Sequence, residues 1–248
     1  MTRAPPAPHA TIQTQLAALA ETAFDHSMNN LLTVILVTVA LPIASVDAQP
    51  YGMPPPAPGQ QLIMPPDPTS HRHVGLFLRP DLGVGFMSTA QPTGTASGNI
   101  TMSGPAGVFG FIIGGAVAEN IILGAHFYDS VIVNPSVSYS GQLGNTSDTS
   151  LALYGMGPAF TYYWMPSNIY LSATLALTRM TLTVNGYSGD SSVGLGTRLA
   201  VGKEWWVSDH WGLGLAGHLS SSWNDSGDYS GTTLSTWAFA VAFSATYN

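Results

Sequence analysis

Residues 233–248 read Thr-Leu-Ser-Thr-Trp-Ala-Phe-Ala-Val-Ala-Phe-Ser-Ala-Thr-Tyr-Asn, and this stretch decides the fold. From Trp237 to Tyr247 every second residue is large and apolar, apart from Ala245, and the residues between them are Ala, Ser or Thr. A period of two is typical of a β-strand, because successive side chains leave opposite faces of the pleat. One face of this strand is therefore bulky and apolar, and the other is small and uncharged.

The two faces indicate what surrounds the strand. A soluble protein usually turns a charged face to water, and residues 237–247 carry no charge on either face. In a transmembrane barrel the large apolar face contacts lipid and the small face fills a narrow lumen. About ten residues at ~3.3 Å each, tilted by ~40°, span roughly 25 Å, the height of the apolar band of such a barrel. Trp237 and Tyr247 are then expected at the two membrane interfaces.

The composition supports a membrane-embedded β-protein. Charged residues make up only 8% of the 248 residues, about a third of the usual share, while 45% are hydrophobic and 27 are glycine. No apolar run reaches the ~20 residues that a membrane-spanning helix requires, so a β-barrel is favoured. The formal net charge of −7 argues against nucleic acid as a partner. The absence of cysteine excludes disulfides and zinc-thiolate sites.

Residues 1–48 are predicted to be an upstream segment and a signal peptide. The apolar run at 31–41 is followed by small residues up to Ala48, after which we expect cleavage. No Lys or Arg stands close before this run, which departs from the usual signal-peptide pattern. Met1 and Met28 therefore both stay open as the start of translation.

Residues 49–72 are rich in proline and are predicted to form an extended periplasmic linker. Residues 73–248 are predicted to form an eight-stranded antiparallel up-and-down transmembrane β-barrel, with bulky side chains outside and small ones within. Pro80 in the first strand is predicted to mark a bulge, because proline removes a ladder donor. Long polar loops are expected at about 88–98, 134–149, 186–191 and 224–232, alternating with tight turns at about 115–120, 165–168 and 207–210. Transmembrane barrels have this asymmetry between their two ends.

The signal peptide, the eight strands, the inward glycines and the aromatic-rich closing strand resemble the small outer-membrane barrels of the OmpA/OmpX-like class. This resemblance covers about residues 73–248, and Asn248 departs from it by replacing the aromatic residue that commonly ends the chain. It implies a Gram-negative-type outer membrane with both barrel termini periplasmic. It also implies outer-membrane lipids, lipopolysaccharide and the barrel-assembly machinery as partners, with extracellular partners met through the loops. Such an architectural likeness supports the fold more than the function.

Seven polar residues occupy inward positions of the predicted strands and are expected to form a plug in the lumen. They are Arg79, Asp81, His126, Tyr128, Arg198, Glu204 and His218. An isolated charge in a narrow lumen is costly, whereas a paired charge is tolerated. We therefore expect the two arginines to pair with Asp81 and Glu204, and both arginines and both histidines to meet in one layer at mid-barrel. Eight strands normally leave room only for side chains, so we expect the lumen to be closed. A narrow porin-like channel for small solutes is the alternative.

Aromatic residues gather beside the predicted turns and near the loops, where a membrane interface is expected. The interface residues predicted from this pattern are Tyr162, Trp164, Trp205, Trp211, Trp223, Trp237 and Tyr247.

The sequence predicts a structural or surface-interaction role without enzymatic activity, cofactor or metal. One alternative is a lipid A-modifying outer-membrane hydrolase, because His218-Leu-Ser220 resembles the His-x-Ser pair of outer-membrane lipid A deacylases. The strand register turns both side chains into the lumen, and no acidic partner is assigned. Asn224, Asp225 and Asp228 supply oxygen atoms that suit Ca²⁺, but a solvated loop is the favoured interpretation.

Overall fold

The computed structural model describes residues 71–92, 98–139, 142–226 and 232–248. The predicted signal peptide and nearly all of the predicted linker lie outside these residues. No helix within the described ranges is long and apolar enough to cross a membrane.

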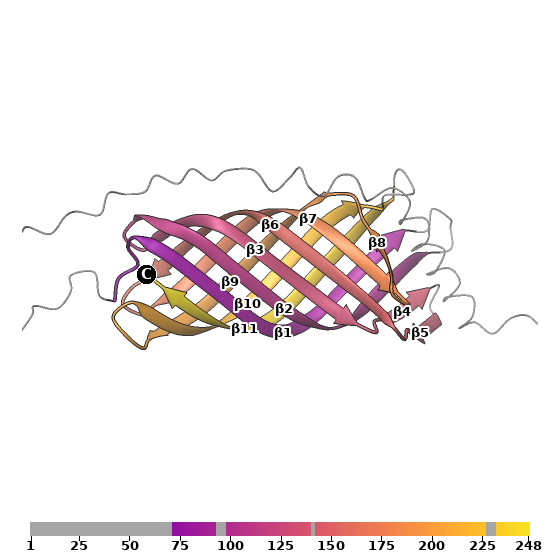
Figure 1. Ribbon diagram of the computed structural model, residues 1–248, viewed down its shortest axis with the longest axis horizontal. Helices are drawn as coiled ribbons and strands as arrows, with labels where there is room; N and C mark the ends of the chain where they lie inside the picture. The colour runs from indigo at the N-terminus through magenta and orange to yellow at the C-terminus, as the bar shows by residue number, and fades with distance from the viewer. Residues whose placement is uncertain (1–70, 93–97, 140–141, 227–231) are drawn as a thin grey trace, which may run out of the picture.

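The described residues form eleven strands, and eight of these close into a barrel (Figure 1). The wall strands are β1 (Leu76–Pro92), β2 (Asn99–Ala118), β3 (Ile121–Val133), β6 (Thr149–Trp164), β7 (Ile169–Val184), β9 (Gly194–Trp206), β10 (Trp211–Asp225) and β11 (Thr233–Tyr247). Three short strands are β4 (Ser136–Tyr139), β5 (Gln142–Asn145) and β8 (Tyr187–Asp190).

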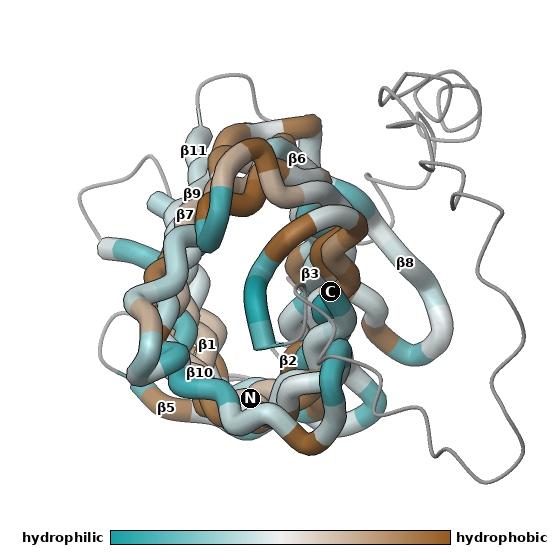
Figure 2. The backbone as a smooth tube through the Cα atoms, turned by 90° about the vertical axis from the view of Figure 1, so that its left-hand side faces the viewer, coloured by the Kyte–Doolittle hydropathy of each residue, from teal (hydrophilic) through white to brown (hydrophobic). Residues whose placement is uncertain are grey.

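Each wall strand pairs antiparallel with both of its neighbours, and β1 closes the ring by pairing with β2 on one side and β11 on the other. Figure 2, turned by 90° from Figure 1, shows the tube of backbone as a ring seen toward one end. The predicted class, an eight-stranded antiparallel transmembrane barrel, is confirmed.

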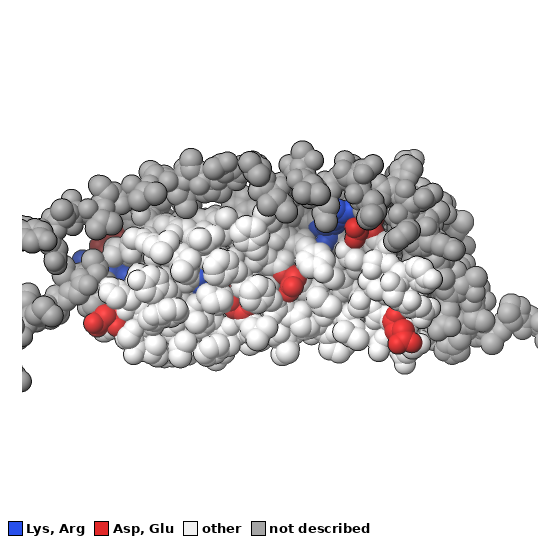
Figure 3. Space-filling view, in the orientation of Figure 1, with Lys and Arg blue, Asp and Glu red and all other residues white. Residues whose placement is uncertain are grey.

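Strand β11 has the two faces that its sequence predicts. Phe239 and Phe243 are both 52% exposed, whereas Ala240 and Ala242 are 2% and 1% exposed. The exposed row is apolar and belongs to a wall that carries few charges on the side visible in Figure 3. A continuous apolar exterior of this kind suits hydrocarbon and is unfavourable in water.

The strands extend further than predicted at the end of the barrel that carries β4, β5 and β8, which we call the loop end. Strand β1 continues to Pro92, where a loop was expected from residue 88. The expected loops at 134–149 and 186–191 contain the short strands, of which β4 pairs with β2 and β8 with β7. The polar residues of these segments predict loops. Polar residues can nevertheless extend a sheet where their backbone N–H and C=O groups pair with a neighbouring strand. At the opposite end, the turn end, the connections are tight.

Pro80 does not mark the predicted bulge. It pairs with Phe111 of β2 in unbroken register, and the partners of β1 on β11 keep the same register on both sides of the proline. The irregularity lies instead in the pairing of β2 with β3, between Ala116 and Ala118. An outward proline can be tolerated here because only one of its two ladders needs the missing N–H.

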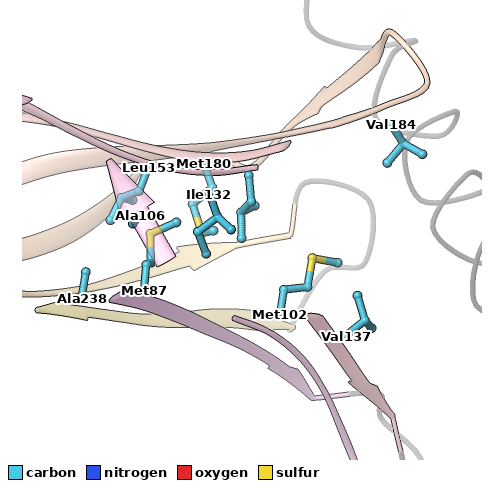
Figure 4. Close-up of a cluster of buried hydrophobic side chains, with 10 residues drawn as sticks. Met87, Met102, Ala106, Ile132, Val137, Leu153, Met180, Val184 and Ala238 are labelled. Carbon is cyan, nitrogen blue, oxygen red and sulfur yellow. The ribbon is translucent and has the colours of Figure 1, made fainter. Parts of the chain in front are cut away.

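Bulky residues also fill part of the lumen, which corrects the prediction that inward residues are small. Near the loop end, inward side chains pack into a buried apolar cluster (Figure 4). The apolar cluster consists of Met87, Met102, Ala106, Ile132, Val137, Leu151, Leu153, Met180, Val184 and Ala238. Where the wall rises beyond the apolar band, the barrel needs an interior like that of a soluble protein, and close-packed aliphatic side chains provide it.

The spacing between β1 and β11 predicts a stability difference between two glycines. A Cβ atom at Gly83 would collide with the backbone of Val241 and Ala242, whereas nothing lies within 4 Å of a Cβ atom at Gly107. We expect Gly83→Val to lower the free energy of unfolding by about 1–3 kcal/mol through overpacking. The matched substitution Gly107→Val should change it by less than about 0.5 kcal/mol. Urea unfolding in lipid vesicles, followed by tryptophan fluorescence, measures both, and equal effects would contradict the described interior.

Candidate functional site in the barrel lumen

Five of the seven predicted plug residues lie together in the middle of the lumen, and we call them the central group: Asp81, His126, Tyr128, Arg198 and His218. Arg198 Nη2 donates a hydrogen bond of 3.2 Å to Asp81 Oδ1, and both side chains are 2% exposed. Arg198 Nε also donates to His218 Nδ1 at 3.1 Å. The guanidinium therefore joins β1, β9 and β10 across the lumen, while β11 between them contributes only small residues there.

The remaining members pack around this arginine. The Cζ atom of Arg198 lies 4.9 Å from the centroid of the Tyr128 ring, a distance at which a cation is attracted to an aromatic face. The rings of His126 and Tyr128 are 5.3 Å apart, and His126 Nδ1 is 2.8 Å from Thr174 Oγ1. The central group therefore draws its side chains from four of the eight wall strands, β1, β3, β9 and β10, and Thr174 connects it to β7.

Glycines opposite the large polar side chains create the room that these side chains occupy. Tyr128 pairs with Gly155 in the β3 and β6 register, and its ring lies where a Cβ atom of Gly155 would be. Asp81 pairs with Gly110 of β2, and its carboxylate fills the corresponding space. Glycine is thus needed at these positions for the close approach of a neighbouring side chain.

The other two predicted plug residues lie closer to the turn end, in what we call the turn-side group: Arg79, Tyr163, Tyr170, Glu204 and Thr246. Arg79 Nη1 donates to Tyr163 Oη at 3.5 Å, and its Cζ atom is 4.2 Å from the centroid of the Tyr170 ring. Tyr163 Oη donates to Glu204 Oε1 at 3.2 Å, and Thr246 Oγ1 donates to the same oxygen at 2.6 Å. Arg79 therefore reaches Glu204 through Tyr163, in a layer separate from the central group.

His73 caps the turn-side group at the turn end, a role that the sequence did not indicate. It is fully buried and its ring stacks on that of Tyr163 with a centroid distance of 3.5 Å. Its Nε2 atom is 2.7 Å from Asn168 Oδ1, and its Nδ1 atom is 2.9 Å from Asn248 Oδ1. The segment that precedes β1, the turn after β6 and the residue after β11 are thereby joined at one end of the barrel.

The alternation of inward and outward positions along β6 and β7 could have identified two lumen residues that the sequence analysis did not assign. Tyr163 and Tyr170 alternate with the outward residues of β6 and β7 and are each 1% exposed. Both flank the predicted turn at about 165–168, and neither is assigned to the lumen in the sequence analysis. His73 has no such signal, because it precedes the first strand.

The predicted interface aromatics occupy outward positions at both ends of the apolar band. The five tryptophans are each about half exposed: Trp164, Trp205, Trp211, Trp223 and Trp237. Near the turn end, the rings of Tyr162 and Trp164 are 4.9 Å apart, and those of Trp211 and Tyr247 are 5.3 Å apart. Trp223 and Trp237 lie in the loop-end halves of β10 and β11.

The contacts of His218 disfavour its use as a base for Ser220. Both side chains are buried in the lumen. Because Arg198 Nε donates to Nδ1, that nitrogen already uses its lone pair, and Nε2 carries the proton of a neutral ring and faces Asp81 Oδ1 at 3.7 Å. A histidine in this state has no free lone pair with which to accept the serine proton.

The calcium alternative gains no support from the described residues. The Asn224 side chain points inward, where its Nδ2 atom donates to the Thr178 carbonyl at 2.8 Å, and Asp228 lies outside the described residues. Within the part of the chain that the structure describes, no three His, Asp or Glu side chains gather as metal ligands.

The closed wall, the apolar exterior and the buried inward side chains define a small eight-stranded transmembrane barrel, the architecture that the OmpA/OmpX-like resemblance implies. No protein-family model matches the sequence, and no curated protein matches it.

Among solved structures, the chain is similar to Neisserial surface protein A, with 12% identity and a TM-score of 0.44, over 70% of this chain and 96% of that one. It is similar to the outer membrane protein OprG of Pseudomonas aeruginosa, with 12% identity and a TM-score of 0.41, over 73% and 100%. It is also similar to the outer membrane protease OmpT of Escherichia coli, with 9% identity and a TM-score of 0.36, over 70% and 96%. The fold assignment rests on the register and burial of this chain itself.

The buried pair of Asp81 and Arg198 predicts strong energetic coupling. Arg198→Leu leaves a carboxylate buried without its cation, so the free energy of unfolding should fall by about 3–5 kcal/mol. The double variant Asp81→Leu with Arg198→Leu removes both charges and should recover part of this loss, with a coupling energy of about 1–3 kcal/mol. Urea unfolding in lipid vesicles measures the cycle, with the exposed Arg72→Ala as a control that leaves stability unchanged. If the losses of unfolding free energy in Asp81→Leu and Arg198→Leu add up to the loss in the double variant, the pair is not coupled.

Proposed function

We propose that the protein is an integral outer-membrane barrel with a closed lumen and a structural or surface-interaction role. The observation that carries this proposal is the continuous filling of the lumen. From the turn end to the loop end, the interior holds His73, the turn-side group, the central group and the apolar cluster, and their side chains are almost all buried. A lumen filled in this way by polar networks and packed aliphatic side chains favours a rigid scaffold over a pore.

The proposed location and orientation follow from the two ends of the barrel. Residues 31–48 would direct export, and the described start of the chain lies beside Asn248 at the turn end, through His73. Short turns face the periplasm in outer-membrane barrels, so we place both barrel termini there. The lipid-facing wall would then contact outer-membrane lipids and lipopolysaccharide after insertion by the barrel-assembly machinery.

The loop end would carry the interaction role. Strands β4 and β5 form a hairpin whose base is fixed by Asn134, because the Thr149 amide donates to Asn134 Oδ1 at 3.2 Å. This hairpin exposes 79% of Leu143, and the short strand β8 begins with Tyr187, which is 67% exposed. Both side chains are therefore accessible to another surface at the loop end.

A filled lumen predicts that the wild-type protein does not conduct. In planar lipid bilayers we expect no stable conductance steps from the purified wild type. Arg198→Ala and Arg79→Ala remove the two guanidinium groups that span the lumen, and each should introduce brief openings, while Arg72→Ala should behave as wild type. Heat-modifiable gel mobility confirms that each variant is folded before it is recorded.

A narrow path for small solutes is the second candidate function. Some buried polar atoms in the lumen have no hydrogen-bond partner among the described residues, including His126 Nε2, Tyr128 Oη and Ser222 Oγ. Buried polar atoms of this kind are commonly satisfied by water, so a chain of water molecules past the central group would be consistent with them. Stable wild-type conductance that Arg198→Ala abolishes would overturn the closed scaffold and establish this path.

The surface-interaction role predicts that the loop-end hairpins control adhesion. Cells that display the protein should adhere to polystyrene, a plain apolar surface, less well when Leu143 and Tyr187 are both replaced by serine. Leu219→Ser on the lipid-facing wall is the matched control, since it removes an exposed apolar side chain away from the loop end. Adhesion that is unchanged by the hairpin variant and reduced by the control would assign the effect to insertion instead.

A further inference from the structure

The outer face of the wall has a groove of about 350 Å³ that crosses β2, β3, β6 and β7 and ends at the residue before β9. Its apolar lining residues are Phe109, Phe127, Met156, Leu177 and Val193. All five are outward-facing and between 39% and 61% exposed. The groove is therefore a hollow in the outer surface of the wall. The buried residues Tyr128, Gly155 and Thr178, which lie between its outward-facing residues along β3, β6 and β7, line it as well.

The groove lies at the loop-end edge of the apolar band. Leu177 pairs with Leu195 of β9, which in turn pairs with Trp223 of β10. The groove and this outward tryptophan thus belong to one cross-strand row. Arg179 follows two residues beyond Leu177 toward the loop end and lines the same groove.

The rim of the groove is polar and carries both signs of charge. Asp129, Tyr154 and Arg179 are successive register partners across β3, β6 and β7, and all three line the groove. Asp129 Oδ1 accepts a hydrogen bond of 3.1 Å from the Phe109 amide. Arg179 Nη2 lies 3.1 Å from Asp190 Oδ2 of β8, and both side chains remain more than a quarter exposed. The outward wall thus changes from apolar to charged within one groove.

We propose that this groove binds one phospholipid of the loop-end leaflet, with an acyl chain between the apolar residues and the headgroup at the Asp129, Tyr154 and Arg179 rim. The surrounding wall already contacts hydrocarbon, so a chain enters the groove without leaving the bilayer. The groove would hold roughly twelve groups of ~30 Å³ each, the volume that one water molecule occupies in the liquid. A row of roughly twelve groups of this size is on the scale of one acyl chain. A zwitterionic headgroup matches the rim, since its phosphate faces Arg179 and its ammonium faces Asp129.

The groove inference requires the proposed membrane insertion, but it does not depend on a closed lumen. A conducting barrel with the same wall would bind the same lipid. The conductance experiment and the lipid experiment therefore fail independently.

The test uses the full-length protein in phosphatidylcholine vesicles that contain a phosphatidylethanolamine with a diazirine in its acyl chain. After illumination, mass spectrometry of peptides gives the number of adducts at each wall position. We expect adducts near Phe127, Met156 and Leu177 to exceed those near Leu215 and Phe243 on the far wall by roughly tenfold, the factor expected for burying two further methylene groups. An excess of unlabelled phosphatidylethanolamine should remove this difference.

Variants that fill the groove separate a binding site from ordinary lipid contact. Met156→Trp should reduce groove adducts to the level of the far wall, whereas the matched control Leu219→Trp should leave them unchanged. Val193→Phe fills the groove from outside the wall strands and serves where Met156→Trp does not show heat-modifiable mobility. Equal labelling of both walls, or groove labelling that survives both filling variants, would overturn the proposal.

Discussion

Closure of the hydrogen-bond ladder is the constraint on which the rest of the structure depends. Within hydrocarbon no water is present to satisfy backbone N–H and C=O groups, so each must be paired within the sheet and the sheet must have no edge. The pairing of β1 with both β2 and β11 meets this requirement. Pro158 lies where the ladder between β6 and β7 omits two pairs, while its pairing with Ala125 of β3 is kept. Proline is thus accommodated without opening the ring.

Closure with eight strands leaves a narrow interior, and that interior explains the composition of the inward face. Several large inward side chains fit because the neighbouring strand offers glycine, as Gly155 does for Tyr128 and Gly202 does for Tyr170. Two chemically different fillings result: hydrogen-bonded polar groups within the membrane-level part and packed aliphatic side chains near the loop end. A buried ionic network such as Asp81, Arg198 and His218 is weak evidence for added stability. Here these residues connect β1, β9 and β10 across the lumen.

The fold could be predicted from the sequence because the two faces of β11 differ so strongly. The same alternation identified the other wall strands and the seven polar lumen residues. The loop end was less predictable, since polar residues such as Thr89 still join a ladder. Asn185-Gly186 between β7 and β8 is a recognised signal for a two-residue hairpin, and both residues have positive φ, yet the short stretch after it was interpreted as loop.

The contacts inside the lumen were harder to predict than the residues that make them. Strand parity assigns Arg79 to the interior, but its level relative to Arg198 depends on the stagger of all the strands between them. This stagger places Arg79 with Tyr163 and Glu204 instead of with the histidines. The contacts of His73 depend on two segments that are distant in sequence, the turn at Asn168 and the end at Asn248. Periodicity within single strands does not contain such information.

The pairing of tyrosine with glycine across neighbouring strands constrains how this barrel can diverge. Tyr128 fills the space beside Gly155, and Tyr170 fills the space beside Gly202, in each case between register partners. A side chain gained at either glycine displaces the ring opposite, and a ring lost leaves a void beside a bare backbone. A substitution at one position of either pair therefore requires a compensating substitution at the other, in which a large and a small residue change places.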